Sequence, residues 1–153
     1  MHQSAANQNV EARYRTMLII WCAMMMSVVM YVVTTFIVQT SEQPGAAPNQ
    51  VLSFVFAGVG TFTAILSFVV RSKLLQQSVE RQDMGLVQTA LIIGCALSEV
   101  PAVLGIVARF ILPGRDYLVL LAISALAMAF HFPRRSNLLA ASYKDPSFGS
   151  GLN

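Results

Sequence analysis

The chain has 153 residues, of which 56% are hydrophobic and only 11% are charged, and its formal net charge at pH 7 is +3. Soluble domains are about 45–50% apolar and about 25% charged, so this composition excludes an ordinary soluble globular domain. The small positive charge is explained by basic segments that flank apolar ones near anionic lipid, and it does not call for nucleic-acid binding.

Four apolar runs occupy most of the chain, at about residues 16–38, 51–70, 87–112 and 117–132. At a rise of 1.5 Å per residue, about 20 apolar residues cross a bilayer as a helix. Strands of a membrane barrel are about ten residues long and alternate in polarity, which these runs do not. We therefore expect an all-α polytopic membrane protein with four transmembrane helices in a single domain, residues 1–153.

The first apolar run follows a polar segment, residues 1–12, that is expected to be a flexible tail. Arg13 and Arg15 precede the run, as basic residues do in a signal peptide. The run is about 22 residues long, however, whereas a signal core has about 7–15, and no small-residue cleavage site follows it. We interpret it as a retained first helix.

The second helix is expected to extend beyond its apolar run to about residue 82. Small residues recur along it, and others occur on the third helix, so that neighbouring helices can approach closely. Close packing of this kind occurs both within an ordinary helical bundle and at the seam of an oligomeric ring. The spacing of the small residues does not distinguish these two structures. The helix-packing residues predicted in this way are Gly58, Gly60, Ala64, Gly94 and Gly105.

The third helix carries one carboxylate, Glu99, close to the centre of its apolar run. Ionisable residues at membrane depth are rare and indicate a functional site, because a charge is costly in hydrocarbon. We expect the carboxyl to be neutral at pH 7 in a bilayer for the same reason. Pro101 has no amide hydrogen, so the carbonyl of Leu97 loses its helical partner and the helix should bend there.

The distribution of Lys and Arg predicts the orientation in the membrane. All of them except Arg109 and Arg115 lie before the first helix, between the second and third, or after the fourth. Loops rich in Lys and Arg stay in the cytoplasm. Both termini and the middle loop are therefore expected to be cytoplasmic, and the segment after the fourth helix, residues 142–153, is expected to be a flexible tail.

A polar loop and the helix after it share a recognisable pattern of residues. The loop contains Arg81, Gln82 and Asp83, and the helix contains Glu99 followed by Pro101. The other residues of the pattern are Gln88, Thr89, Ile93, Gly94, Ala96, Leu97, Gly105, Ile106 and Val107. Over roughly residues 50–112, the chain resembles the proteolipid, or c subunit, of rotary ATP synthases.

In that family, two helices joined by a cytoplasmic loop form a hairpin that packs into a ring. A mid-membrane Asp or Glu on the second helix of the hairpin binds the transported proton or sodium ion. The resemblance implies that Glu99 binds a proton or another cation and that the chain works within an oligomeric assembly. Two further helices, one on each side, extend the hairpin in this chain.

The sequence leaves two possible positions open for each of the side chains of His131 and Arg109. Glu99 and His131 both lie roughly 20 Å below the short loop between the third and fourth helices, so His131 is a possible partner of Glu99. Alternatively, His131 lies at the cytoplasmic interface beside Arg134 and Arg135. Arg109 extends either to the outer headgroups or along an access path to Glu99.

Other chemistry is largely excluded by the sequence. No P-loop, H-E-x-x-H or G-x-S-x-G motif occurs, and Cys22 and Cys95 lie in different apolar runs. We expect no enzymatic activity, no metal site and no cofactor. The expected partners are the lipid bilayer and other membrane subunits, either copies of this chain or different ones. The expected location is the cell (inner or plasma) membrane.

Two functional classes remain open. In the first, Glu99 is the protonatable site of a proton- or cation-translocating assembly. In the second, the chain is a non-transporting helical subunit or scaffold, and Glu99 is a buried acid with a neighbouring partner. Small four-helix drug–proton antiporters are a third possibility, but their glutamate lies on the first helix, and residues 16–38 contain none.

Overall fold

The structure, a computed structural model, describes residues 2–38, 50–112 and 114–142, and these form helices and short connections without any strand. The fold class is therefore all-α over the described residues. The helices are α1 (His2–Ile37), α2 (Gln50–Glu80), α3 (Met84–Ile111), α4 (Tyr117–Phe130) and α5 (Arg135–Ser142).

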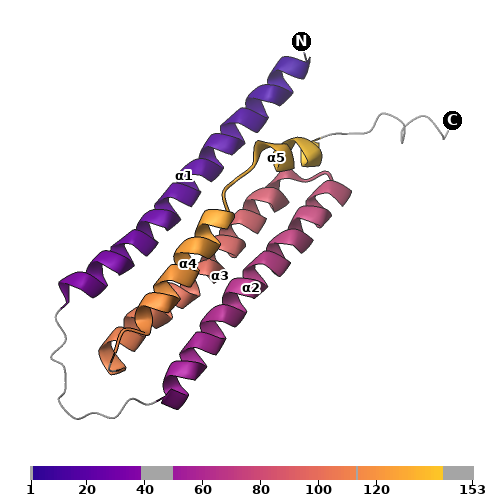
Figure 1. The fold of residues 1–153 in the computed structure, drawn as a ribbon. Helices are drawn as coiled ribbons and strands as arrows, with labels where there is room; N and C mark the ends of the chain where they lie inside the picture. Colours follow the sequence, from indigo (N-terminus) through magenta and orange to yellow (C-terminus); the bar gives the residue numbers. More distant parts are fainter. Residues whose placement is uncertain (1, 39–49, 113, 143–153) are drawn as a thin grey trace.

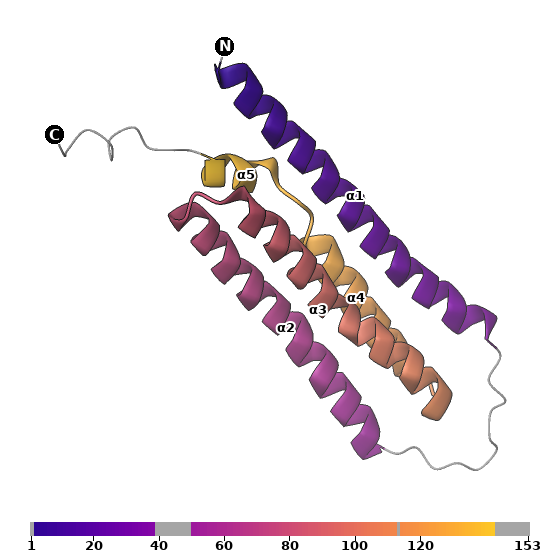
Figure 2. The ribbon, with the colours of Figure 1, turned by 180° about the vertical axis from the view of Figure 1, so that it is seen from behind.

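The long helices lie side by side in a bundle in which α3 is the central member (Figures 1 and 2). It packs against α2 on one side, against α4 on another, and against α1. The start of α1, the turn between α2 and α3, and the short helix α5 lie at one end of the bundle. The connection between α3 and α4 lies at the other end.

Small side chains allow the neighbours of α3 to approach closely. Its buried positions recur every three or four residues, which places them along one broad face of the helix. They are Val87, Ala90, Leu91, Gly94, Cys95, Ser98, Pro101, Ala102, Gly105 and Ala108. Because most of these residues are small, α2 and α4 can pack near the backbone of α3.

The outer surface of the bundle is apolar. Phe54 on α2 is 74% exposed and Phe130 on α4 is 70% exposed, and many other large apolar side chains also face outward. Three helical segments are long and apolar enough to cross a membrane: Gln8–Ile37, Gln50–Glu80 and Met84–Ile111. The number becomes four if α4 and α5 together form one bent span. These features indicate a membrane protein.

The tight turn between α2 and α3 contains Arg81, Gln82 and Asp83. Gln82 has a positive φ of 51°, which reverses the chain direction. Asp83 is the N-cap of α3, and its carboxylate accepts a hydrogen bond of 2.7 Å from the amide of Gly85. Such a cap satisfies an amide that has no partner inside the helix. The residues of the predicted loop motif therefore form this turn.

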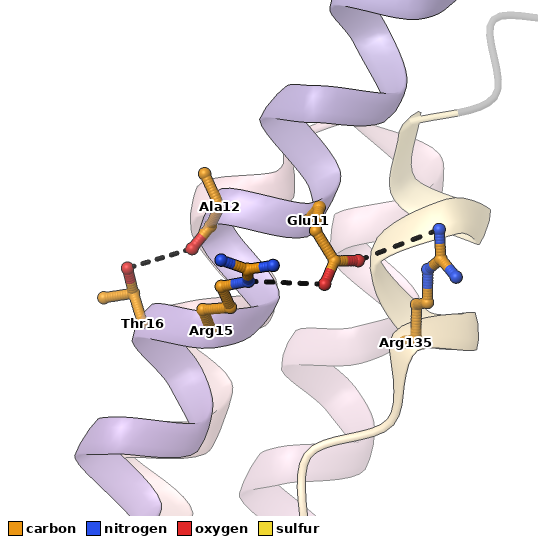
Figure 3. A network of polar contacts seen from close by, with 5 residues as sticks. All are labelled: Glu11, Ala12, Arg15, Thr16 and Arg135. Carbon is orange, nitrogen blue, oxygen red and sulfur yellow. Dashed lines mark hydrogen bonds and ion pairs between the residues drawn. The ribbon is translucent and has the colours of Figure 1, made fainter.

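The first helix begins earlier than the sequence indicated, since residues 2–12 are helical rather than a tail. Val10 is buried in a cluster that includes Leu138 of α5. Glu11 lies 3.5 Å from Arg15 and 3.9 Å from Arg135 of α5 (Figure 3). Exposed ion pairs of this kind add little stability. The burial of Val10 therefore stabilises the contact between α1 and α5 more than these ion pairs do.

The fourth predicted helix, over residues 117–132, is α4, which ends two residues earlier at Phe130. A further short helix, α5, follows it at an angle of 47°. Pro133 explains the break, because it lacks an amide hydrogen and restricts the residue before it. The helix α5, which the sequence did not predict, buries Leu138 and Ala141 against the bundle. Residues 143–153 of the predicted tail lie outside the described residues.

Candidate functional site

Glu99 lies on α3, about 22 Å along the helix axis from Met84 and about 18 Å from Ile111. Its side chain is partly exposed at the surface of the bundle. One carboxyl oxygen, Oε1, is hydrogen-bonded to the hydroxyl of Ser27 on α1. The carboxyl therefore bridges α1 and α3 near the middle of both apolar segments.

The Ser27 hydroxyl also lies 2.7 Å from the carbonyl oxygen of Met24. A hydroxyl has one proton to donate and two lone pairs with which to accept. If the proton goes to Met24, a protonated Glu99 can still donate to Ser27. If Glu99 is ionised, the hydroxyl turns and donates to the carboxylate. Rotation of one hydroxyl thus accommodates both protonation states of Glu99.

Pro101 is buried within α3 and faces α2. A Cβ atom built on Gly60 would lie 3.5 Å from the Cβ of Pro101. Because Pro101 has no N–H, the Leu97 carbonyl oxygen lacks its usual helical donor. Among the described residues, no side chain donates to that oxygen, and the hydrogen-bond partner of Glu99 is Ser27.

His131, the predicted partner of Glu99, lies elsewhere. It caps the carboxyl end of α4, where its Nδ1 lies 2.7 Å from the Ala127 carbonyl oxygen. The ring is fully buried and its centre lies 4.6 Å from that of Phe68. It packs against Gly94, which is about 7.5 Å along α3 from Glu99 and on a different face. The structure does not bring the two side chains together.

The register of α4 against α3 explains this separation. The α4 helix begins beside Gly105, where a Cβ atom would lie 3.2 Å from the Tyr117 carbonyl oxygen. It therefore starts about 10 Å inside the end of α3 rather than level with Leu112. The α4 residue that meets α3 next to Glu99 is Ser124, which donates to the Ser98 carbonyl oxygen at 2.6 Å.

A buried line of three serines crosses the bundle at this level. The Ser98 hydroxyl of α3 lies 3.2 Å from the Ser67 hydroxyl of α2. Ser124 of α4 completes the line through its bond to Ser98. All three side chains are fully buried, and each has a hydrogen-bond partner. The sequence marked Ser67 only as one of the small packing residues of the second helix, and it did not single out Ser27, Ser98 or Ser124, although a hydroxyl inside an apolar run is a visible signal.

Backbone carbonyl oxygens at the carboxyl end of α4 accept hydrogen bonds from side chains of two other helices. Arg71 of α2 donates to the carbonyl oxygens of Phe130 at 3.1 Å and Phe132 at 3.2 Å. The indole of Trp21 on α1 donates to the Met128 carbonyl oxygen at 3.0 Å. The last carbonyls of a helix have no partner inside it, and a cation near them is favourable. The sequence identified Arg71 only as one of the basic residues of the middle loop.

The predicted packing residues lie on different surfaces. Gly60, Ala64, Gly94 and Gly105 are buried between helices. At Gly58 a Cβ atom would meet nothing within 4 Å, so this residue faces outward from α2. Four of the five predicted small positions on α2 and α3 thus face other helices of the chain, and α4 is the neighbour of Gly60, Gly94 and Gly105.

Arg109 lies near the end of α3 opposite the α2–α3 turn. The central carbon of its guanidinium is 5.2 Å from the centre of the Tyr117 ring, a cation–π geometry. Its Nε atom is buried without a hydrogen-bond partner among the described residues. It makes no ion pair with Glu99.

Within the described part of the chain, no group of three or more His, Cys, Asp or Glu side chains is arranged to hold a metal ion. Cys22 is exposed and Cys95 is buried, and neither forms a disulfide. Comparison of the chain with models of protein families, with curated proteins and with solved structures finds no match.

Proposed function

We propose that this chain is a four-span membrane protein in which Glu99 binds a proton, or another cation, for translocation within an oligomeric assembly. The observation that carries the proposal is the hydrogen bond between Glu99 and Ser27. It gives a carboxyl in the middle of an apolar helix a partner that serves both of its protonation states. The resemblance to the proteolipid hairpin, over roughly residues 50–112, points to the same chemistry.

The partial exposure of Glu99 supports exchange of the proton. A carboxyl sealed inside the bundle would have no route out of it, whereas this one lies at the surface of the bundle beside Ser27 of α1. A neighbouring subunit that packs on this surface would supply the access path. That subunit is either a second copy of the chain or a different protein.

The four spans of the proposal are α1, α2, α3 and the bent pair of α4 and α5. With 14 residues, α4 alone is about 21 Å long, less than the roughly 30 Å of the hydrocarbon core. We place both termini and the α2–α3 turn in the cytoplasm. The start of α1, the α2–α3 turn and α5 lie together at one end of the bundle (Figure 1). Most of the Lys and Arg of the sequence lie in or next to these segments.

A second candidate function, a non-transporting subunit or scaffold, is favoured by one observation. Glu99 already has its hydrogen-bond partner within the chain, as do the buried Ser67, Ser98 and Ser124. A polar group that is satisfied in this way can serve packing alone.

Proton flux into proteoliposomes separates the two functions. Vesicles that contain the purified assembly and an internal pH-sensitive dye are given a pH gradient and a counter-ion path. In the transport function, Glu99→Gln keeps the hydrogen bond to Ser27 but abolishes the protein-dependent flux. The matched control is Glu80→Gln, which changes an exposed carboxylate near the α2–α3 turn and should leave the flux intact.

Flux that survives Glu99→Gln, or no flux above empty vesicles in the wild type, would favour the scaffold. The size of the assembly in mild detergent adds an independent measurement. A large homogeneous oligomer fits the transport function, and a monomer or a tight heteromeric complex fits the scaffold.

A further inference from the structure

A cavity of about 370 Å³ lies between α2, α3 and α4, at the end of the bundle opposite the α2–α3 turn. Small-molecule sites in proteins have volumes of roughly 300–1,000 Å³, so the cavity is at the lower end of that range. Its inner wall is apolar and includes Phe56, Ala57, Ala108 and Leu120. The proposed proton site is not part of this cavity, because neither Ser27 nor Glu99 lines it.

The polar groups of the cavity are at its outer end. Gln50 is the first residue of α2, and Asp116 immediately precedes α4. Ser53, one turn into α2, donates to Oδ2 of Asp116 at 2.6 Å. The cavity is therefore open to the surface of the bundle beside the exposed Phe54 and Val119, with a mainly apolar lining and a carboxylate at its outer end, or mouth.

The carboxylate of Asp116 is exposed and does not cap its own helix. An Asp at this position usually accepts a hydrogen bond from the first turn of the helix, but its side chain makes no such bond. Among the described residues it has no ion-pair partner, and its one hydrogen-bond partner is Ser53. A carboxylate can accept about four hydrogen bonds, and among the described residues Ser53 supplies one of them.

We propose that this cavity binds a small amphiphile with a cationic ammonium head and a single short apolar chain. The ammonium donates to Asp116 at the mouth, and the chain fills the space against Phe56, Ala108 and Leu120. The charge of Asp116 selects a cation over a neutral or anionic head. The volume favours a free amine over a phospholipid, which carries two long acyl chains.

Three probes that share an eight-carbon chain test the head-group preference: n-octylammonium, 1-octanol and octanoate. Binding is measured by equilibrium dialysis against the full chain in phosphatidylcholine nanodiscs, with empty nanodiscs as the blank. We expect saturable uptake of one octylammonium per chain, with an affinity about tenfold higher than that of octanol, as one charge-assisted hydrogen bond provides. Octanoate should bind more weakly than either.

Two variants locate the binding. Asp116→Asn removes an exposed charge and should lower the octylammonium affinity about tenfold, to that of octanol. Ala57→Phe fills the cavity and should remove the saturable binding of all three probes. The control is Glu80→Gln, which removes an exposed carboxylate at the other end of the bundle and should change nothing. Circular dichroism confirms that each variant keeps its helices.

Several results would overturn the proposal. Equal affinities of the wild type and Asp116→Asn would show that the carboxylate does not bind the head. Saturable binding that persists in Ala57→Phe, or no saturable binding at all, would show that the cavity is not the site. If phosphatidylethanolamine in the nanodiscs displaces octylammonium, the occupant is a lipid head group and not a free amine.

Discussion

The guanidinium of Arg71 lies at the carboxyl end of α4, where it donates to the Phe130 carbonyl oxygen at 3.1 Å. The same group donates to Phe132 beyond the helix break. Arg71 therefore holds both sides of the α4–α5 junction from α2. A helix can end inside an apolar bundle only if its last carbonyls find donors, and Arg71 supplies two of them.

Replacement of Arg71 should destabilise this junction. In Arg71→Met, the carbonyls of Phe130 and Phe132 lose their donors, at a cost of about 1–3 kcal/mol. The matched control is Lys73→Met, which removes an exposed cation from the same helix. Thermal unfolding of both variants in one detergent, followed by circular dichroism, checks the prediction. Equal melting temperatures would show that the Arg71 contacts do not stabilise the fold.

The contact of Gly94 with His131 predicts a second effect. In Gly94→Ala, the added methyl would lie 2.5 Å from His131 Cδ2, and the buried ring is held by Ala127 and Phe68. We expect a loss of about 1–3 kcal/mol, as is typical of overpacking. Gly58→Ala adds the same methyl to open space and should be neutral or stabilising by up to about 1 kcal/mol.

A double mutant tests whether the effect of Gly94→Ala arises at His131. Combined with His131→Ala, the substitution should cost much less than it does alone, because the clashing ring is absent. If the losses of stability of the two single mutants add up in the double mutant, Gly94→Ala destabilises the protein through a contact other than the one with His131.

The carboxyl of Glu99 should be visible by infrared spectroscopy as a protonated group at pH 7 in a bilayer, because a charge is costly at that depth. Glu99→Gln identifies the band by removing it. Ser27→Ala should shift the frequency of the band, since the carboxyl loses its hydrogen-bond partner. An unshifted band would mean that the two residues do not touch in the membrane. Conversion to carboxylate by about pH 5, close to the value of about 4.3 for a solvated glutamate, would mean that Glu99 faces water.

The proposed orientation is tested by labelling single cysteines in a background with Cys22→Ser and Cys95→Ala. Gln77 and Arg115 are both exposed. Gln77 lies in the last turn of α2, next to the α2–α3 turn, and Arg115 lies between α3 and α4, at the opposite end of the bundle (Figure 1). In intact cells, an impermeant reagent should label a cysteine at position 115 and leave one at position 77 unlabelled until the membrane is opened. The reverse pattern would invert the orientation.

Composition and apolar run length were sufficient to predict the all-α fold class and the long helices. They succeed because a helix that crosses a membrane must satisfy its own backbone and present apolar side chains outward, and both demands are local. The position of Glu99 in its helix follows from the same counting. The loop at Arg81, Gln82 and Asp83 was also located in the sequence, because polar residues separate the apolar runs there, whereas the N-cap role of Asp83 came from the structure.

Only the tertiary structure decided which side chains meet. The partner of Glu99 is Ser27, 72 positions away, and nothing in the spacing around either residue specifies how α1 rotates against α3. His131 was matched to Glu99 by depth, but α4 begins beside Gly105 and so shifts every α4 residue along α3. Local sequence located the apolar parts of the four long helices, but not α5 or the start of α1. Packing of small residues between helices determines their register, and the register positions the site.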